Sequence, residues 1–150
     1  RQAPPGPCVA NRTRHGGVQD RHSGGLWDNV YDWCDGIYVS GATVYCIKNP
    51  AQFSDTSGGT QVGTRATASN YISHWTNPTA EGFEYALYPD QVNGSETTYV
   101  CDYCYYSSSG VVLLVGGNYG QNQLRGAFYL DGTAASSHYI SIGCRLMKLP

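Results

Sequence analysis

One pair of cysteines has a spacing that metal and redox sites use, Cys101-Asp-Tyr-Cys104. A zinc site would need a second such pair or a pair of histidines, and the sequence offers neither. A redox pair would be expected at the start of a helix, whereas the surrounding TTYVCDYCYY has the composition of a strand, in which positions three apart face opposite sides. The chain is large enough to fold without disulfides, so we expect most of its six cysteines to be small buried hydrophobic residues.

Other catalytic arrangements are equally incomplete. Ser137 and His138 are adjacent, but no small-residue elbow frames a nucleophile there. Asp32 and Asp35 are too few for a hard-cation site, and hydrogen bonds to the backbone of a tight turn explain them better. The segment GGNYGQNQ lacks the spacing of a phosphate-binding loop. We therefore predict no catalytic residue, no metal ligand and no cofactor, and expect a protein that is not an enzyme.

The composition limits the classes of partner that we expect. The 150 residues fit one domain, and only 13% of them are charged. A net charge of −2 gives no basic footprint for nucleic acid, and no apolar run approaches the ~20 residues of a membrane span. Tyrosine and glycine are abundant, with 13 and 19 residues, a composition typical both of antibody binding loops and of an ordinary loop-rich β protein.

The first half of the chain predicts an arm followed by strands. Residues 1–25 carry three prolines and no periodic pattern, which indicates an extended N-terminal arm or linker. Residues 26–39 are rich in aromatic core material that includes Trp33. Two apolar runs, 37–39 and 43–47, flank Ser40-Gly41 and predict a β-hairpin, and 61–64 predicts a further short strand.

The second half predicts strands around a long irregular segment. NYISHW at 70–75 is expected to be a short helix or turn, and residues 98–115 to be a second hairpin. A closing strand is expected at 142–147. Between the apolar run 111–115 and that strand, the chain has neither the helical nor the strand period, and a segment of that length is usually functional. We interpret it as a binding surface held by a scaffold.

The C-terminal residues GGNYGQNQLRGAFYL…SIGCRL resemble the variable region of the C-type-lectin-fold variable proteins that diversity-generating retroelements diversify. The framing motifs of that family correspond here to Gly116-Gly117-Asn118-Tyr119, Gly126-Ala127-Phe128 and residues 142–146. Upstream, residues 28–36 (DNVYDWCDG) are similar to the Gly-Asn-Val-Trp-Glu-Trp-x-x-Gly motif of the formylglycine-generating-enzyme-like branch, with Asp28 in place of Gly and Tyr31 in place of Trp.

The resemblance covers about residues 26–149 and implies an α+β C-type lectin fold, mostly antiparallel β with one or two short helices and long loops. It implies a ligand-binding domain at 26–150 whose variable region spans about 103–145. Such a domain would bind a protein or glycan receptor on a cell surface. It would be displayed in several copies, for which a homo-oligomer is one arrangement, on a virion tail or fibre or on a bacterial cell surface.

In that family, adenines of a template are copied unfaithfully, so Asn codons scatter into many residue types but never into Trp, Met, Lys, Gln or Glu. Residues 129–141 contain none of those five, whereas Gln121 and Gln123 mark fixed frame. The resemblance thereby assigns the ligand face to a set from the variable region, with tyrosines of a neighbouring strand beside it: Tyr103, Cys104, Tyr105, Tyr106, Asn118, Tyr119, Asp131, Gly132, Thr133, Ser137, His138, Tyr139, Ile140 and Ser141.

Two alternatives remain. A calcium-dependent carbohydrate-binding lectin would carry a Glu-Pro-Asn or Gln-Pro-Asp tripeptide, of which Tyr88-Pro89-Asp90 is a partial echo. A formylglycine-generating-like oxidase would use a reactive cysteine pair, but the motif that should flank Cys101 and Cys104 is missing.

The division into frame and face makes an energetic prediction. Surface changes usually cost less than about 0.5 kcal/mol, so we expect replacement of Tyr139 or His138 to alter binding with little loss of stability. Trp33→Ala or Phe128→Ala, as core substitutions, would cost several kcal/mol.

Overall fold

The computed structural model describes residues 19–20, 24–25, 30–98, 100–108, 112–121 and 126–143. Strands dominate this described part, and its one helix is the 3-10 turn η1, Pro50–Gln52, capped by the Asn49 side chain. The expectation of a mostly β protein is confirmed, whereas the one or two short α-helices are not found among these residues. No helix in the described residues is long and apolar enough to cross a membrane.

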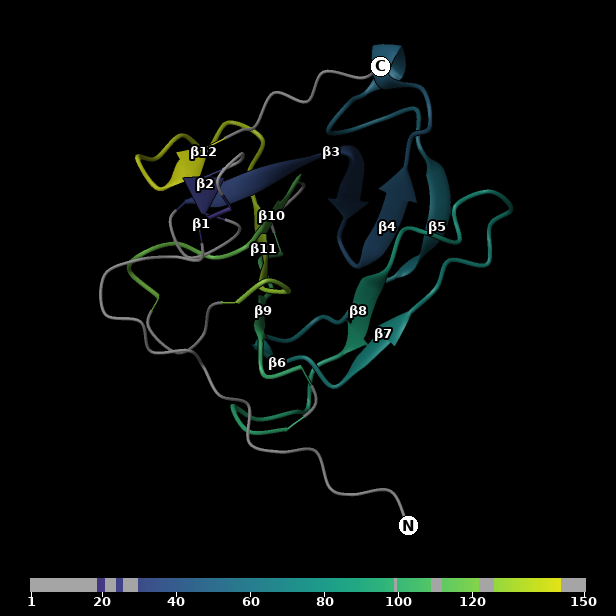
Figure 1. Ribbon diagram of the computed structural model, residues 1–150. Coiled ribbons are helices and arrows are strands. Elements are labelled where there is room, and N and C mark those ends of the chain that lie inside the picture. Colours follow the sequence, from purple (N-terminus) through teal and green to yellow (C-terminus); the bar gives the residue numbers. More distant parts are fainter. Residues whose placement is uncertain are drawn as a thin grey trace.

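An eight-stranded sheet forms the centre of the molecule (Figure 1). Neighbouring strands in this sheet are antiparallel, with two exceptions: β9 runs parallel to β11, and β12 runs parallel to the start of β3. Two small sheets pair β1 (Gln19–Asp20) with β2 (Gly24–Gly25), and β7 (His74–Thr76) with β8 (Tyr88–Gln91). In spatial order, the main sheet contains β5 (Thr60–Thr64), β4 (Thr43–Cys46), β3 (Tyr31–Ser40), β10 (Val112–Val115), β11 (Leu130–Thr133), β9 (Tyr103–Tyr105) and β6 (Asn70–Tyr71), with β12 (Ile142–Gly143) beside β3.

The first hairpin prediction is confirmed. β3 and β4 are antiparallel neighbours, with Ser40 opposite Thr43, so the turn lies at residues 41–42, one residue later than expected. Gly41 has a φ of 60°, in the left-handed region that a tight hairpin turn requires and that glycine adopts most easily. Val39 and Val44 face each other in the core, with exposed fractions of 1% and 0%. The short strand expected near residues 61–64 is also present as β5.

The second hairpin prediction is wrong. β9 pairs with β6 and β11, and β10 pairs with β3 and β11, so the two strands expected to pair are separated by β11. Cys101 has a φ of 60° and interrupts the extended backbone, which leaves β9 only three residues long. The segment expected to lack structure supplies β11 instead, because Leu130 fills the core between these two strands.

Two further elements differ from the sequence predictions. NYISHW is not helical: it forms β6 and β7, separated by the fully buried Ile72. β3 begins at Tyr31, so Asp32 and Asp35 lie in a strand rather than in a tight turn. Most of the predicted arm at residues 1–25, Trp27, and residues 144–147 of the closing strand fall outside the described residues.

The sheet has a hydrophobic core on each face. The main core contains Leu113 and Leu130, and the smaller second core contains Leu114, Tyr31 and Tyr129. Successive residues of a strand point to opposite faces, so neighbouring leucines of β10 serve different cores.

Trp33 and Phe128 are less buried than predicted. Trp33 is only partly buried against the second core. Phe128 is 56% exposed and packs edge-on against Trp75, with ring centroids 6.0 Å apart. The core position expected for Phe128 is therefore wrong, and we now expect its truncation to cost about 1 kcal/mol, the scale of an aromatic contact at a surface.

Candidate functional site

The face of the sheet that carries the second core also carries exposed tyrosines. On β9, Tyr103 and Tyr105 point to this face, and Tyr105 lies opposite Asp131 of β11. Tyr103 packs edge-on against Tyr71 at 5.3 Å, while Tyr105 is 48% exposed. The parallel pairing of β9 with β11 thus brings together two parts of the predicted ligand face that are separated by more than twenty residues of sequence.

Two of the predicted ligand residues point the other way. Cys104, between the two tyrosines, is 1% exposed and belongs to the main core. Gly132, the next residue after Asp131, is buried, and a Cβ at this position would lie 2.7 Å from Nη1 of Arg65. Strand alternation therefore removes both residues from the surface, and the sequence could have shown this had residues 130–133 been recognised as a strand.

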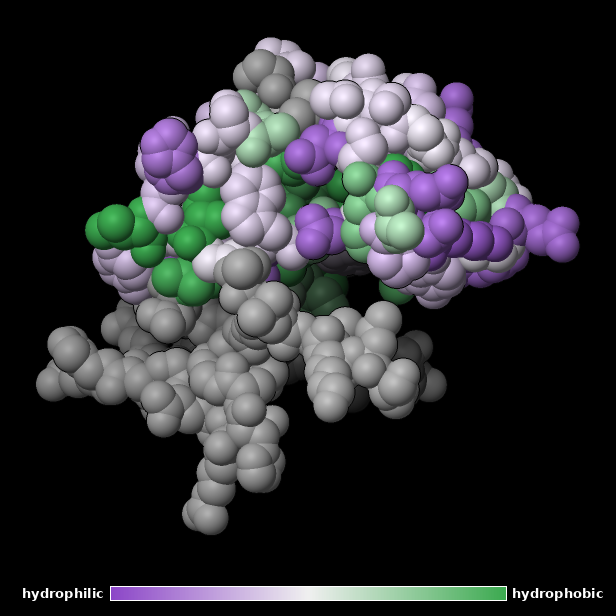
Figure 2. Space-filling model, turned by 90° about the horizontal axis from the view of Figure 1, so that it is seen from above, coloured by the Kyte–Doolittle hydropathy of each residue, from purple (hydrophilic) through white to green (hydrophobic). Residues whose placement is uncertain are grey.

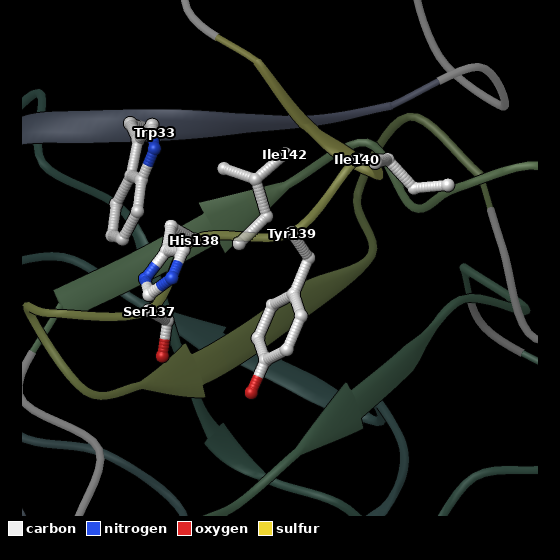
Figure 3. Close-up of a pocket in the computed structure, with 6 residues that line it drawn as sticks. All are labelled: Trp33, Ser137, His138, Tyr139, Ile140 and Ile142. Atoms are coloured by element: carbon white, nitrogen blue, oxygen red, sulfur yellow. The ribbon is translucent and has the colours of Figure 1, made fainter.

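A hollow of about 390 Å³ opens beside this face, between β3 and the loop that leads to β12 (Figure 3). Three of its lining residues, His138, Tyr139 and Ile140, are exposed, so the hollow is open to solvent. In Figure 2, strongly hydrophobic residues reach the surface at the left, the side on which Figure 1 places β12. The lining consists of Trp33, Ser137, His138, Tyr139, Ile140 and Ile142.

Four of these six residues, Ser137 to Ile140, belong to the predicted ligand face. Trp33 and Ile142 were assigned to the frame instead. Trp33 comes from β3, about a hundred residues earlier in the chain, and it reaches the hollow because β12 pairs with the start of β3. No sequence signal could show this, since it depends on which strands become neighbours.

Backbone and side-chain hydrogen bonds fix the loop between β11 and β12. The Ser137 amide donates to the Ala134 carbonyl at 2.9 Å, and the Ile142 amide donates to the Tyr139 carbonyl at 3.0 Å. The hydroxyls of Thr133 and Ser137 lie 2.8 Å apart. The loop is also tied to β3, where the Tyr31 amide donates to the Ser141 carbonyl at 2.7 Å. The exposed side chains of this loop are therefore attached to a backbone that hydrogen bonds hold in place.

His138 has a defined tautomer in this arrangement. Its Nδ1 atom lies 3.0 Å from the carbonyl oxygen of Ser136, which can only accept a hydrogen bond, so Nδ1 carries the proton. In the neutral ring, Nε2 then presents a lone pair as an acceptor. The Ser137 hydroxyl is hydrogen-bonded to the Thr133 hydroxyl, and the His138 ring is hydrogen-bonded to the Ser136 carbonyl. This arrangement differs from that of a catalytic serine, whose hydroxyl is hydrogen-bonded to its histidine base.

The remaining predicted residues lie outside the hollow. Tyr119 is 58% exposed at the tip of a turn, and the Asn118 side chain accepts from the Gly120 amide at 2.8 Å. Tyr106 lies over the guanidinium of Arg65 at 4.8 Å. Gln121, which we expect to be a frame residue, donates from Nε2 to the buried Tyr129 hydroxyl at 2.6 Å.

Asp131 of β11 and Arg65, which follows β5, are two charged groups in this part of the molecule. Burial raises the pKa of Asp131 to about 6, and attraction to Arg65 opposes this shift only in part. Burial also lowers the pKa of Arg65, which is 2% exposed. Its Nη2 donates to the Ser107 carbonyl at 3.2 Å, while Nε and Nη1 are buried without a hydrogen-bond partner among the described residues. The guanidinium therefore occupies its site at a cost that the surrounding fold must offset.

Cys101 and Cys104 do not form a redox pair. Cys101 is disulfide-bonded, but not to Cys104, which is a free thiol. Burial raises the pKa of Cys104 to about 11, as it does for Cys34, so both thiols are protonated and unreactive at neutral pH. Within the described ranges, no group of three or more potential metal ligands occurs. Asp90, from the partial lectin tripeptide, pairs with Nδ1 of His74 at 2.6 Å.

No family model, curated protein or solved structure was found that matches this chain. The class of protein is therefore described from the structure alone. It is a β-rich domain with tyrosines along one face of its sheet and an open hollow at the side of that face.

Proposed function

We propose that this is a non-enzymatic display domain, in which exposed side chains of the variable region set target specificity for attachment to a host or cell surface. In this proposal the chain is a C-type-lectin-fold variable protein of a diversity-generating retroelement. The observation that carries the proposal is the composition of the hollow, since four of its six lining residues come from the segment that the retroelement resemblance marks as variable.

The alternation along the strands supports the same proposal. Tyr105 and Asp131 lie on the face that continues into the hollow, whereas Cys104 and Gly132 face the main core. A diversified surface needs such a division, because replacement of a buried residue costs stability and replacement of an exposed one usually does not. Under this proposal Cys104 and Gly132 belong to the frame, and the other predicted ligand residues make up the variable set.

The loop backbone supports it as well. The bonds from Ser137, Ile142 and Tyr31 that hold this loop are made by backbone amides, so they are independent of the side chains displayed. Individual contacts at an open hollow are weak, and display of several copies on a virion or cell surface would supply the avidity for firm attachment.

The DNA that flanks the coding region provides the test. We expect a near-copy of codons 103–145 that differs only at adenines and lies beside a reverse-transcriptase gene. The near-copy should differ from the gene at codons of outward-facing residues, such as Tyr105 and Tyr139. It should not differ at the codons of Cys104 and Gly132. Codons 30–98 are the internal control and should have no such copy. A near-copy with differences at all four bases, or the absence of any near-copy, would contradict the proposal.

A further inference from the structure

The lining of the hollow carries information about the ligand. With His138 neutral, none of the six lining side chains bears a charge, and the lining combines apolar surface with hydroxyl and imidazole groups. A charged ligand would lose its hydration here without an ion-pairing partner in return. An uncharged ligand that is apolar on one side and carries hydroxyls on the other fits this lining.

The apolar part of the hollow is a platform rather than a deep pocket. Trp33 and Ile142 are both partly buried against the second core, so their positions are fixed by packing. Figure 3 shows the rings of Trp33 and His138 beside each other, with Ile142 next to them and the Tyr139 ring directed away. A rigid aromatic surface open to solvent can pack against a ring with aliphatic C–H groups, and it leaves the edge of that ring accessible to polar groups.

The polar part supplies one acceptor and one donor. Nε2 of His138 is an acceptor because Nδ1 donates to Ser136. The hydroxyls of Thr133 and Ser137 share one hydrogen bond, in which either can donate. With Thr133 as the donor, the proton of Ser137, which lines the hollow, is left for a ligand. An acceptor and a donor on adjacent residues are complementary to neighbouring hydroxyl groups, each of which can donate and accept.

We propose that the hollow binds a single pyranose ring of a glycan without a metal ion, with the C–H face of the sugar on Trp33 and its hydroxyls on His138 and Ser137. This inference rests on the display function proposed above and names the ligand class of the same site. The volume of about 390 Å³ lies at the lower end of the range for small-molecule sites, which suits one sugar ring. Trp33 then acts as a fixed binding residue from outside the variable region, while the residues around it vary.

The test is a titration of the isotope-labelled full chain with methyl pyranosides of mannose, glucose, galactose and N-acetylglucosamine, followed by NMR in the presence of EDTA. At least one sugar should shift the Trp33 indole N–H and the amides of residues 137–142 in a saturable manner, with a dissociation constant in the millimolar range. His138→Phe keeps a ring but removes the Nε2 acceptor, and Trp33→Leu removes the platform. Each should weaken binding by about tenfold, the change that loss of about 1.4 kcal/mol produces.

Trp75→Leu is the matched control, because Trp75 packs against the main core on the other face. It should leave the dissociation constant unchanged, and the spectra report directly whether each variant is folded. The inference is overturned when no pyranoside shifts these signals, when a shift appears only after EDTA is replaced by excess calcium, or when it survives both His138→Phe and Trp33→Leu.

A blocked Gly-Leu-Gly peptide distinguishes the other ligand class. A response to this peptide in place of the sugars assigns the hollow to an apolar protein side chain and also overturns the glycan inference. The DNA test does not depend on the ligand, so a positive near-copy with a negative sugar titration preserves the display function and rejects only the sugar.

Discussion

Asp131→Asn should stabilise the protein at neutral pH. Burial raises the pKa of Asp131 from 3.8 to about 6, so the folded state binds its proton more tightly than the unfolded state does. The free energy of unfolding therefore falls as the pH rises from about 4 to about 6, and it stays lower above that range. Asparagine resembles the protonated acid and lacks this dependence. The variant should match the wild type below pH 4 and exceed it above pH 6.

The magnitude follows from the same pKa. A shift from 3.8 to about 6 corresponds to about 3 kcal/mol, which is an upper limit because the side chain retains some exposure. Screening by solvent reduces the expected gain to about 1–3 kcal/mol. In a chain of this size, each kcal/mol raises the melting temperature by about 2–4 °C.

Urea unfolding followed by circular dichroism between pH 4 and pH 8 measures the effect. Asp55→Asn, in an exposed loop, is the control and should leave the free energy of unfolding unchanged within about 0.5 kcal/mol. If Asp131→Asn is less stable than the wild type at pH 7.5, attraction to Arg65 outweighs the burial cost and the reasoning is refuted.

Gly132→Ala should destabilise the protein by about 1–3 kcal/mol in urea unfolding, because its Cβ would lie 2.7 Å from Nη1 of the buried Arg65. Ile72→Ala, at a position with 0% exposure, should cost about 2–5 kcal/mol. Tyr139→Ala should change the free energy of unfolding by less than about 0.5 kcal/mol, and equal losses at these two sites would contradict the division into frame and face. The Cys104 thiol, whose pKa is raised to about 11, should resist iodoacetamide at pH 8 until urea is added, as mass spectrometry of its peptide would report.

Local sequence patterns predicted the elements whose partners are close in the chain. The β3–β4 hairpin could be recognised because two apolar runs flank a glycine turn, and a two-residue turn leaves its strands no other partner. The β-rich class followed from the same kind of pattern. The low charge that disfavours nucleic acid is likewise a property of the sequence alone.

Pairings between distant strands could not be predicted in this way. Residues 98–115 looked like a hairpin because both runs favour extended backbone, yet β11 lies between them in the sheet. β11 itself carries Asp and Gly, which strands disfavour, and it forms because Leu130 and Gly132 fit the main core. Burial gained over long sequence separations thus outweighed local propensity.

For the candidate site, too, some features could be predicted from the sequence and others depended on the tertiary structure. The sequence by itself led us to predict residues 137–141 as part of a variable ligand face, since composition and the family resemblance both act at that local level. Only the tertiary structure placed Trp33 beside them and turned Cys104 and Gly132 inward. The physical reason is that strand pairing fixes both which distant residues become neighbours and which face of the sheet each side chain occupies.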